Sequence, residues 1–363
     1  MKTNFIRKHW VYFILLGFIV LANVAPRMTP EEEEVVLETT EQPGVFLDLQ
    51  EAGEKSERIQ KIIEEDTPLY LLYIALNLSV VFLFFLGLYI DGYIVLQRRK
   101  NREVFKRTNF FPAPEWKIPD VARIVILAVS LSYAFFILLS FCMGALESMT
   151  GARFHIFDAQ NFRMIFDTIV LDLCILLVIL KFMQRMKVNG LEVFGLQKKG
   201  LGQNIVYGAM GYAAVMPVIL VIGVVIYAIL NLLNLRPPPQ PIVGLFLAEK
   251  NTALIVLSSL IAAVFGPIIE EIFFRGVMYN AVKRKAGVFW GILVTSVLFS
   301  FLHTHAASYF LVGFIPIAIL GAALAYLYEK TGSLIPSMTL HVLNNVGSVA
   351  MVFVFKYFNS LAG

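Results

Sequence analysis

Long apolar runs dominate this sequence and restrict the folds open to it. A membrane-spanning helix needs about 20 mostly apolar residues, and nine segments come close to that length. Hydrophobic residues make up 58% of the 363 positions and charged residues only 15%, so a water-soluble fold could not bury all of this apolar surface. We therefore predict an all-α polytopic membrane protein with about nine transmembrane helices. The expected spans are Trp10–Ala25, Leu69–Leu96, Val121–Leu146, Phe162–Met183, Asn204–Leu233, Thr252–Val282, Gly287–His303, Tyr309–Tyr328 and Ser333–Tyr357.

The basic residues indicate how the chain is oriented. With the N-terminus in the cytoplasm, most Lys and Arg residues fall in cytoplasmic loops, as the positive-inside rule requires. This topology predicts a multi-pass protein of the cell membrane and places the acidic loop of residues 26–68 outside the cytoplasm. The first span has a basic start that also fits a signal peptide. Pro26 follows the small residues of any cleavage site, which favours a retained anchor.

Charge and cysteine content exclude several other classes of protein. The net charge of +4 comes from short basic clusters between apolar runs, which is the pattern of membrane-flanking loops, so we expect a bilayer and no nucleic acid as partner. One such cluster lies between Arg98 and Arg107 and could bind anionic lipid headgroups, although fixing the topology is its simpler role. Cys142 and Cys174 both lie in apolar segments and indicate neither a disulfide framework nor a Cys-rich zinc site.

Three regions follow from these patterns. Residues 1–120 contain the anchor span, the acidic loop, the second span and a basic cytoplasmic loop. Residues 121–240 contribute further transmembrane helices. A proline-rich connection of Pro237, Pro238, Pro239 and Pro241 then separates these from residues 241–363, where the ionisable residues inside spans are concentrated. Such residues are costly in a bilayer and are functional candidates by default.

Two adjacent carboxylates lie within the predicted span Thr252–Val282. Glu271 and Arg275 are four residues apart, so they share a helix face and can pair, whereas Glu270 points about 100° away. Glu271 is therefore expected to be held by Arg275, and Glu270 is left without a local partner in a low-dielectric setting that suits a general base. Pro267 cannot donate to the carbonyl of Ala263 and is expected to kink this helix and admit water.

Two further spans supply the other polar groups. A lone His303 at a helix end would more often be a cap than a catalyst, but His341 and Asn345 also share one face of the last span. A Glu–His pair can activate a water, and a His with an Asn can donate hydrogen bonds to the oxyanion that develops on a carbonyl. Together these residue types predict a site for peptide hydrolysis inside the membrane.

The order of these motifs resembles the CPBP family, which includes the type II CAAX prenyl proteases and bacterial relatives linked to bacteriocin immunity and abortive infection. The resemblance covers about Thr252–Gly347 and rests on an EExxxR, an FxxxH and an HxxxN motif. These read Glu270-Glu271-xxx-Arg275, Phe299-xxx-His303 and His341-xxx-Asn345.

This resemblance implies a core of the last four to five helices and an intramembrane endopeptidase of the glutamate type that needs no cofactor. It also implies a membrane protein or peptide as substrate, lipidated or not. The roles that it implies are water activation by Glu270 and His303, an oxyanion hole of His341 and Asn345, and support from Glu271, Arg275 and Phe299.

Three alternatives remain open at the level of sequence. Glu270, His303 and His341 could hold zinc in a metallopeptidase, although no HExxH helix is present. The same fold could act without catalysis, as an immunity protein or scaffold. Buried Glu and His residues also mark proton paths in transporters. Resistance to chelation, the phenotype of Glu270→Ala and flux in proteoliposomes would separate these alternatives.

Overall fold

The computed structural model describes residues 10–19, 49–109, 114–151, 159–188, 190–233, 241–304 and 310–361, and all regular structure within these ranges is helical. The all-α prediction is therefore confirmed. The predicted basic start of the chain, the acidic stretch 26–48 and Pro237–Pro239 lie outside the described residues. The remainder of the predicted acidic loop contains helix α3 (Leu49–Glu65). Asp66 then caps α4 (Thr67–Arg99), because its side chain accepts the backbone N–H of Leu69 at 3.1 Å.

Six helical stretches of the described chain are long and apolar enough to cross a membrane. They are Thr67–Arg99, Ile118–Thr150, Leu201–Leu232, Thr252–Ala286, Val312–Thr331 and Leu334–Leu361. The chain is therefore a multi-pass membrane protein, and its described residues contain fewer spans of full length than the nine expected.

The described parts of the other three predicted spans are also helical but fall short of this standard. Helix α6 (Gln160–Arg185) is long enough but carries charged residues along its length, among them Asp167 and Asp172. Trp10–Ile19 and α12 (Val288–His303) are shorter apolar helices. With 16 residues, α12 is only about 24 Å long, less than the hydrocarbon thickness of about 30 Å.

The chain divides into two compact units. The first contains Ile118–Lys187 and the described part of Met1–Leu47. In it, α5 (Ile118–Thr150) packs against α6 around Ala128, Val170 and Cys174. The second contains Asp48–Lys117 and Val188–Gly363 and holds every predicted site residue.

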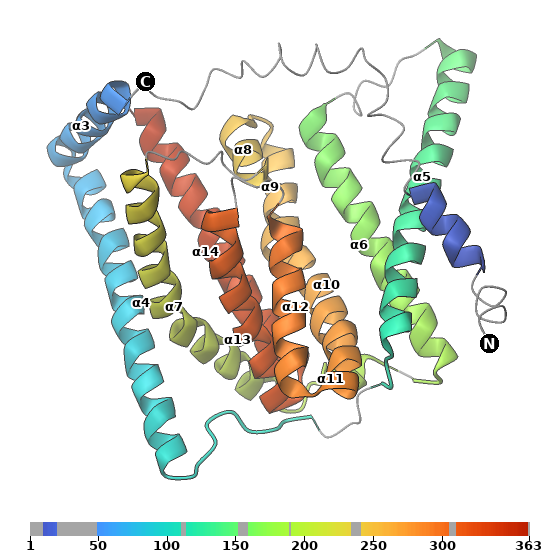
Figure 1. The fold of residues 1–363 in the computed structure, drawn as a ribbon. Helices are drawn as coiled ribbons and strands as arrows, with labels where there is room; N and C mark the ends of the chain where they lie inside the picture. The colour runs from blue at the N-terminus through green and yellow to red at the C-terminus, as the bar shows by residue number, and fades with distance from the viewer. Residues whose placement is uncertain are drawn as a thin grey trace. The chain divides into compact units, whose positions relative to one another are not determined.

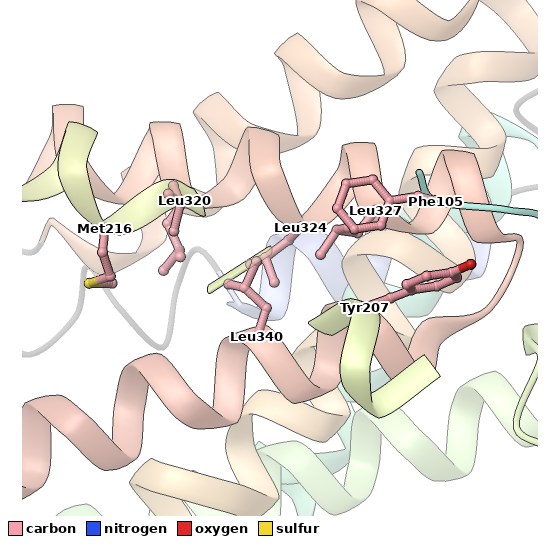
Figure 2. Close-up of a cluster of buried hydrophobic side chains, with 8 residues drawn as sticks. Phe105, Tyr207, Met216, Leu320, Leu324, Leu327 and Leu340 are labelled. Carbon is pink, nitrogen blue, oxygen red and sulfur yellow. The ribbon is translucent and has the colours of Figure 1, made fainter. Parts of the chain in front are cut away.

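Three long helices form the framework of the second unit. Helices α7 (Leu201–Leu232), α13 (Ile315–Thr331) and α14 (Leu334–Leu361) pack on one another, as Figure 1 shows. Their shared core is drawn in Figure 2 and consists of Phe105, Tyr207, Val215, Met216, Leu320, Leu324, Leu327 and Leu340. Leu324, Leu327 and Leu340 are at most 2% exposed in this core, and van der Waals packing of this kind drives the association of membrane helices.

Small residues let these helices approach closely. A Cβ atom at Gly208 of α7 would lie 2.5 Å from the Cβ of Thr339 on α14 and 2.6 Å from the backbone oxygen of Pro336. A Cβ at Gly321 of α13 would lie 3.1 Å from the Cα of Ser296 on α12. Such contacts of helix backbones are typical of membrane helix packing, and they fix α12, α13 and α14 around the polar residues described next.

Candidate active site

The helical stretch Thr252–Ala286 is not regular along its length. After α9 (Thr252–Leu260) it passes through a π-helical segment, η4 (Ile261–Phe265), then α10 (Gly266–Glu271), a second π-helical segment, η5 (Ile272–Tyr279), and α11 (Asn280–Ala286). Both predicted carboxylates lie in the short α10, between the two π segments. Segments of this kind are rare in proteins, and those that do occur are often found at functional sites.

Glu271 and Arg275 form a fully buried ion pair. The Arg275 guanidinium donates to Glu271 Oε1 at 2.6 Å, and both side chains are 0% exposed. A second N–H of Arg275 donates to the backbone oxygen of Gly321 at 3.2 Å, which links this helix to α13. The pairing expected from the i,i+4 spacing is therefore present in the structure.

Glu271 also binds a predicted site residue, a contact that the spacing of residues along the chain does not indicate. Its Oε1 atom lies 3.0 Å from Nδ1 of His341, 70 residues further along the chain. Because the paired carboxylate only accepts hydrogen bonds, Nδ1 of His341 carries the hydrogen in this contact. The bond sets the orientation of the ring and turns its Nε2 atom toward Glu270.

Glu270 faces both imidazoles. Its Oε2 atom lies 3.7 Å from Nε2 of His303 and 3.7 Å from Nε2 of His341. These distances are too long for a direct hydrogen bond but short enough for one water to contact both groups. Among the described residues, Oε2 of Glu270 is buried without a hydrogen-bond partner. The side chains of Glu270 and His303 are 30% and 35% exposed, against 2% for His341, so water can reach this side of the cluster.

The tautomer of His303 is fixed by its own helix. Its Nδ1 atom lies 2.8 Å from the backbone oxygen of Phe299, which can only accept, so Nδ1 donates. The neutral ring then presents a lone pair on Nε2 toward Glu270. That arrangement suits an atom that receives a proton.

Phe299 is the apolar centre around which these groups assemble. Its ring centroid lies 4.3 Å from that of His303 and 5.5 Å from that of His341, and the Arg275 guanidinium carbon lies 4.6 Å from it. The ring is 1% exposed. Phe299 therefore separates the charged pair from the wet side of the cluster and supports both imidazoles.

Asn345 follows His341 by one turn of α14 and is held by the first π segment. Its Nδ2 donates to the backbone oxygen of Ala262 at 2.9 Å, and its Oδ1 accepts from Asn344 at 3.2 Å. Ala262 has this oxygen free because the π turn shifts the register by one residue. The N–H of Gly266 donates five residues back, to Ile261, and Pro267, the next residue, has no N–H. In a regular α-helix, as predicted from the sequence, Pro267 would instead free the oxygen of Ala263.

The structure thus brings six of the seven predicted residues into one connected cluster and places the seventh beside it. Glu270, Glu271, Arg275, Phe299, His303 and His341 contact one another through the distances above, whereas the side chain of Asn345 is hydrogen-bonded to Ala262 and Asn344. One hydrogen of its Nδ2 points to Ala262, which leaves the second hydrogen for another acceptor.

Glu270, His303 and His341, the three candidate zinc ligands, are spaced more widely than the ligands of a tetrahedral zinc ion. Ligand atoms around a tetrahedral zinc at 2.0–2.1 Å lie about 3.3 Å from one another, and Glu270 Oε2 lies 3.7 Å from each Nε2. In the part of the chain that the structure describes, no group of three or more His, Cys, Asp or Glu residues is arranged to hold a metal.

A comparison with known protein families finds a match over the residues that form this cluster. Residues 252–347 match the model of the type II CAAX prenyl endopeptidase Rce1-like family, and that range runs from α9 to α14 and contains all seven predicted residues. The chain contains an Rce1-like domain. The Rce1-like domain makes up about a quarter of the sequence, and α4 and α7 pack beside it in the same unit.

One curated relative is similar over a stretch of about the same length. The putative membrane peptidase YdiL of Bacillus subtilis is 30% identical over 98 residues, which is 26% of this chain and 37% of the relative. The similarity thus spans little more than a third of that protein and is confined to a stretch the length of the Rce1-like domain. No solved structure matches the chain.

Proposed function

We propose that this protein is an intramembrane endopeptidase that cleaves a membrane protein or peptide with a water activated by Glu270 and His303. The observation that carries the proposal is the convergence of Glu270 Oε2 on the Nε2 atoms of His303 and His341, at 3.7 Å each. The match of residues 252–347 to the Rce1-like family supports a peptidase.

The chemistry proposed for these side chains is a direct hydrolysis. A water between Glu270 and His303 gives a proton to this pair as its oxygen bonds to the carbonyl carbon of the peptide. The carbonyl electron pair moves onto its oxygen, and the oxyanion accepts hydrogen bonds from Asn345 and His341. The C–N bond then breaks, and the leaving nitrogen takes the proton from Glu270 or His303.

His341 can donate to the oxyanion only under one condition. Its Nδ1 hydrogen is used by Glu271, so Nε2 is a donor only when the ring carries both hydrogens. Glu271, held by Arg275 at 2.6 Å, accepts the Nδ1 hydrogen in that form as well. The proposal therefore gives Glu271 a positioning role through His341 in addition to its pairing with Arg275.

The test compares cleavage products in membranes that contain the wild type or Glu270→Gln. The variant keeps the shape of the side chain and removes the base, so products are expected only with the wild type. His303→Ala is expected to reduce product formation by about 10²–10⁴-fold, the usual size of a general acid–base contribution. Normal turnover by Glu270→Gln would refute water activation by this residue.

Two further measurements address the alternatives. We also propose that the reaction needs no metal, so product formation is expected to survive strong chelation, and its loss and recovery with zinc would favour the zinc peptidase instead. If Glu270→Gln keeps a protective or binding phenotype while making no product, the biological role of the fold is non-catalytic.

A further inference from the structure

A short basic segment leaves the end of α4 and crosses beneath the Rce1-like domain. This segment, the basic strap, comprises residues 100–109 and is visible in Figure 1 as the chain that continues from the lower end of α4. Four exposed cationic side chains lie on it or directly before it, namely Arg99, Lys100, Arg102 and Lys106. Within the described chain, none of these side chains takes part in a hydrogen bond or an ion pair.

The basic strap is held firmly in place. Phe105 is 5% exposed, and its ring packs edge-on against Tyr207 at 5.5 Å between centroids. The backbone N–H groups of Thr108 and Asn109 donate to the carbonyl of Thr331 at 2.9 and 3.2 Å. The Asn109 side chain donates to the backbone oxygen of Gly332 at 2.9 Å. The strap is therefore fixed to the turn between α13 and α14, and a ligand would not bear the entropic cost of ordering it.

The one acidic side chain of the strap does not neutralise these cations. Glu103 pairs with Lys330 of α13 at 2.6 Å. The hydrogen bond and the charge of Lys330 hold the pKa of the Glu103 carboxyl below its usual range. The four unpartnered positive charges are therefore available to bind an anion from outside the chain.

The position of the strap along α4 identifies that anion. Large apolar side chains of α4 are exposed up to its last turn, as Val95 (51%) and Leu96 (56%) show, and Arg99 follows three residues later. In a spanning helix, such a switch from exposed apolar to exposed basic residues lies where hydrocarbon gives way to phosphate. The cations are thus at the level of lipid headgroups, whichever leaflet this is.

We propose that the basic strap, with Arg99, Lys100, Arg102 and Lys106, is a binding surface for the headgroups of anionic phospholipids. A topology signal needs only the charges. It does not require that the charged residues lie on a segment that is hydrogen-bonded to the turn before α14, the helix that carries His341. This proposal is independent of the proposed peptidase activity, and its test uses binding alone.

The experiment titrates the full-length protein in neutral detergent with phosphatidylglycerol, phosphatidylcholine or glycerol phosphate and counts bound molecules by native mass spectrometry. The strap variant is Arg102→Gln with Lys106→Gln. The matched control, Arg58→Gln with Lys61→Gln, removes the same two charges from exposed positions of α3, beyond the other end of the 33-residue α4. A charge-conserving variant, Arg102→Lys with Lys106→Arg, tests whether the fold tolerates substitution.

Phosphatidylglycerol is expected to bind the wild type, the control and the charge-conserving variant with similar affinity. The strap variant is expected to bind about 25-fold more weakly, because each cation near an anionic surface contributes about a fivefold effect. Equal binding by the strap variant and the wild type would overturn the proposal. Equal binding of phosphatidylcholine, or of free glycerol phosphate, would also overturn it, since the surface would then not be selective for anionic lipid.

Discussion

Removing the Glu271 carboxylate is expected to destabilise the protein more than any exposed substitution. In the wild type this group accepts from Arg275 at 2.6 Å and lies 3.0 Å from Nδ1 of His341, with Glu271 and Arg275 both 0% exposed. Glu271→Ala leaves a guanidinium buried without a countercharge, and its Nε atom already has no acceptor among the described residues. Breaking one partner of a buried pair costs about 3–5 kcal/mol, and we expect a loss of unfolding free energy in that range.

A double-mutant cycle tests whether an uncompensated buried charge causes this loss of stability. Arg275→Ala strands the Glu271 carboxylate and is expected to cost a similar amount. The double variant strands no charge, so its loss should be smaller than the sum of the two single losses, with a coupling of about 0.5–3 kcal/mol. Glu271→Gln keeps an acceptor for His341 and serves as the control for shape.

The measurement is unfolding of the purified protein by an increasing fraction of denaturing detergent in mixed micelles. Peptide cleavage is followed in parallel, because Glu271→Ala also releases Nδ1 of His341. Two results would refute the reasoning: a loss of unfolding free energy below about 1 kcal/mol for Glu271→Ala, or losses in the two single variants that add up to the loss in the double variant. Either would show that removing one partner does not leave a costly uncompensated charge.

The other predictions concern packing, the π segment and metal dependence. Gly208→Ala places a Cβ 2.5 Å from that of Thr339 and is expected to cost about 1–3 kcal/mol in the same unfolding assay. Gly223→Ala on the same helix meets nothing within 4 Å and should gain up to about 1 kcal/mol, so similar effects would contradict the packing argument. Pro267→Ala restores a backbone N–H that competes with Asn345 for the Ala262 oxygen. We therefore expect a larger relative loss of cleavage than of unfolding free energy, and the opposite order would contradict this role of Pro267. Chelation should leave product formation unchanged, as measured before and after dialysis against a strong chelator.

Much of this molecule follows from local rules. Long apolar runs predict membrane helices because the bilayer leaves few other structures for them, and helices cover nearly all described residues of the nine predicted segments. Glu271 and Arg275 pair at 2.6 Å, as their spacing of four residues predicted, and they do so even though the segment from Ile272 is π-helical. The three motifs also locate the cluster, since charged and polar residues in the middle of apolar helices need a reason to be there.

Long-range contacts and departures from regular helix geometry came only from the tertiary structure. A second lone pair on Glu271 was a signal that it could take another donor, but nothing in the sequence pointed to His341, 70 residues away. The sequence shows that Pro267 has no N–H to donate, but only the π turn determines that Asn345 binds the backbone oxygen of Ala262 and not that of Ala263. Helix periodicity determines which residues share a face, so a single sequence predicts faces. Which faces meet depends on packing against other helices, and this packing decided that Glu270 lies between His303 and His341.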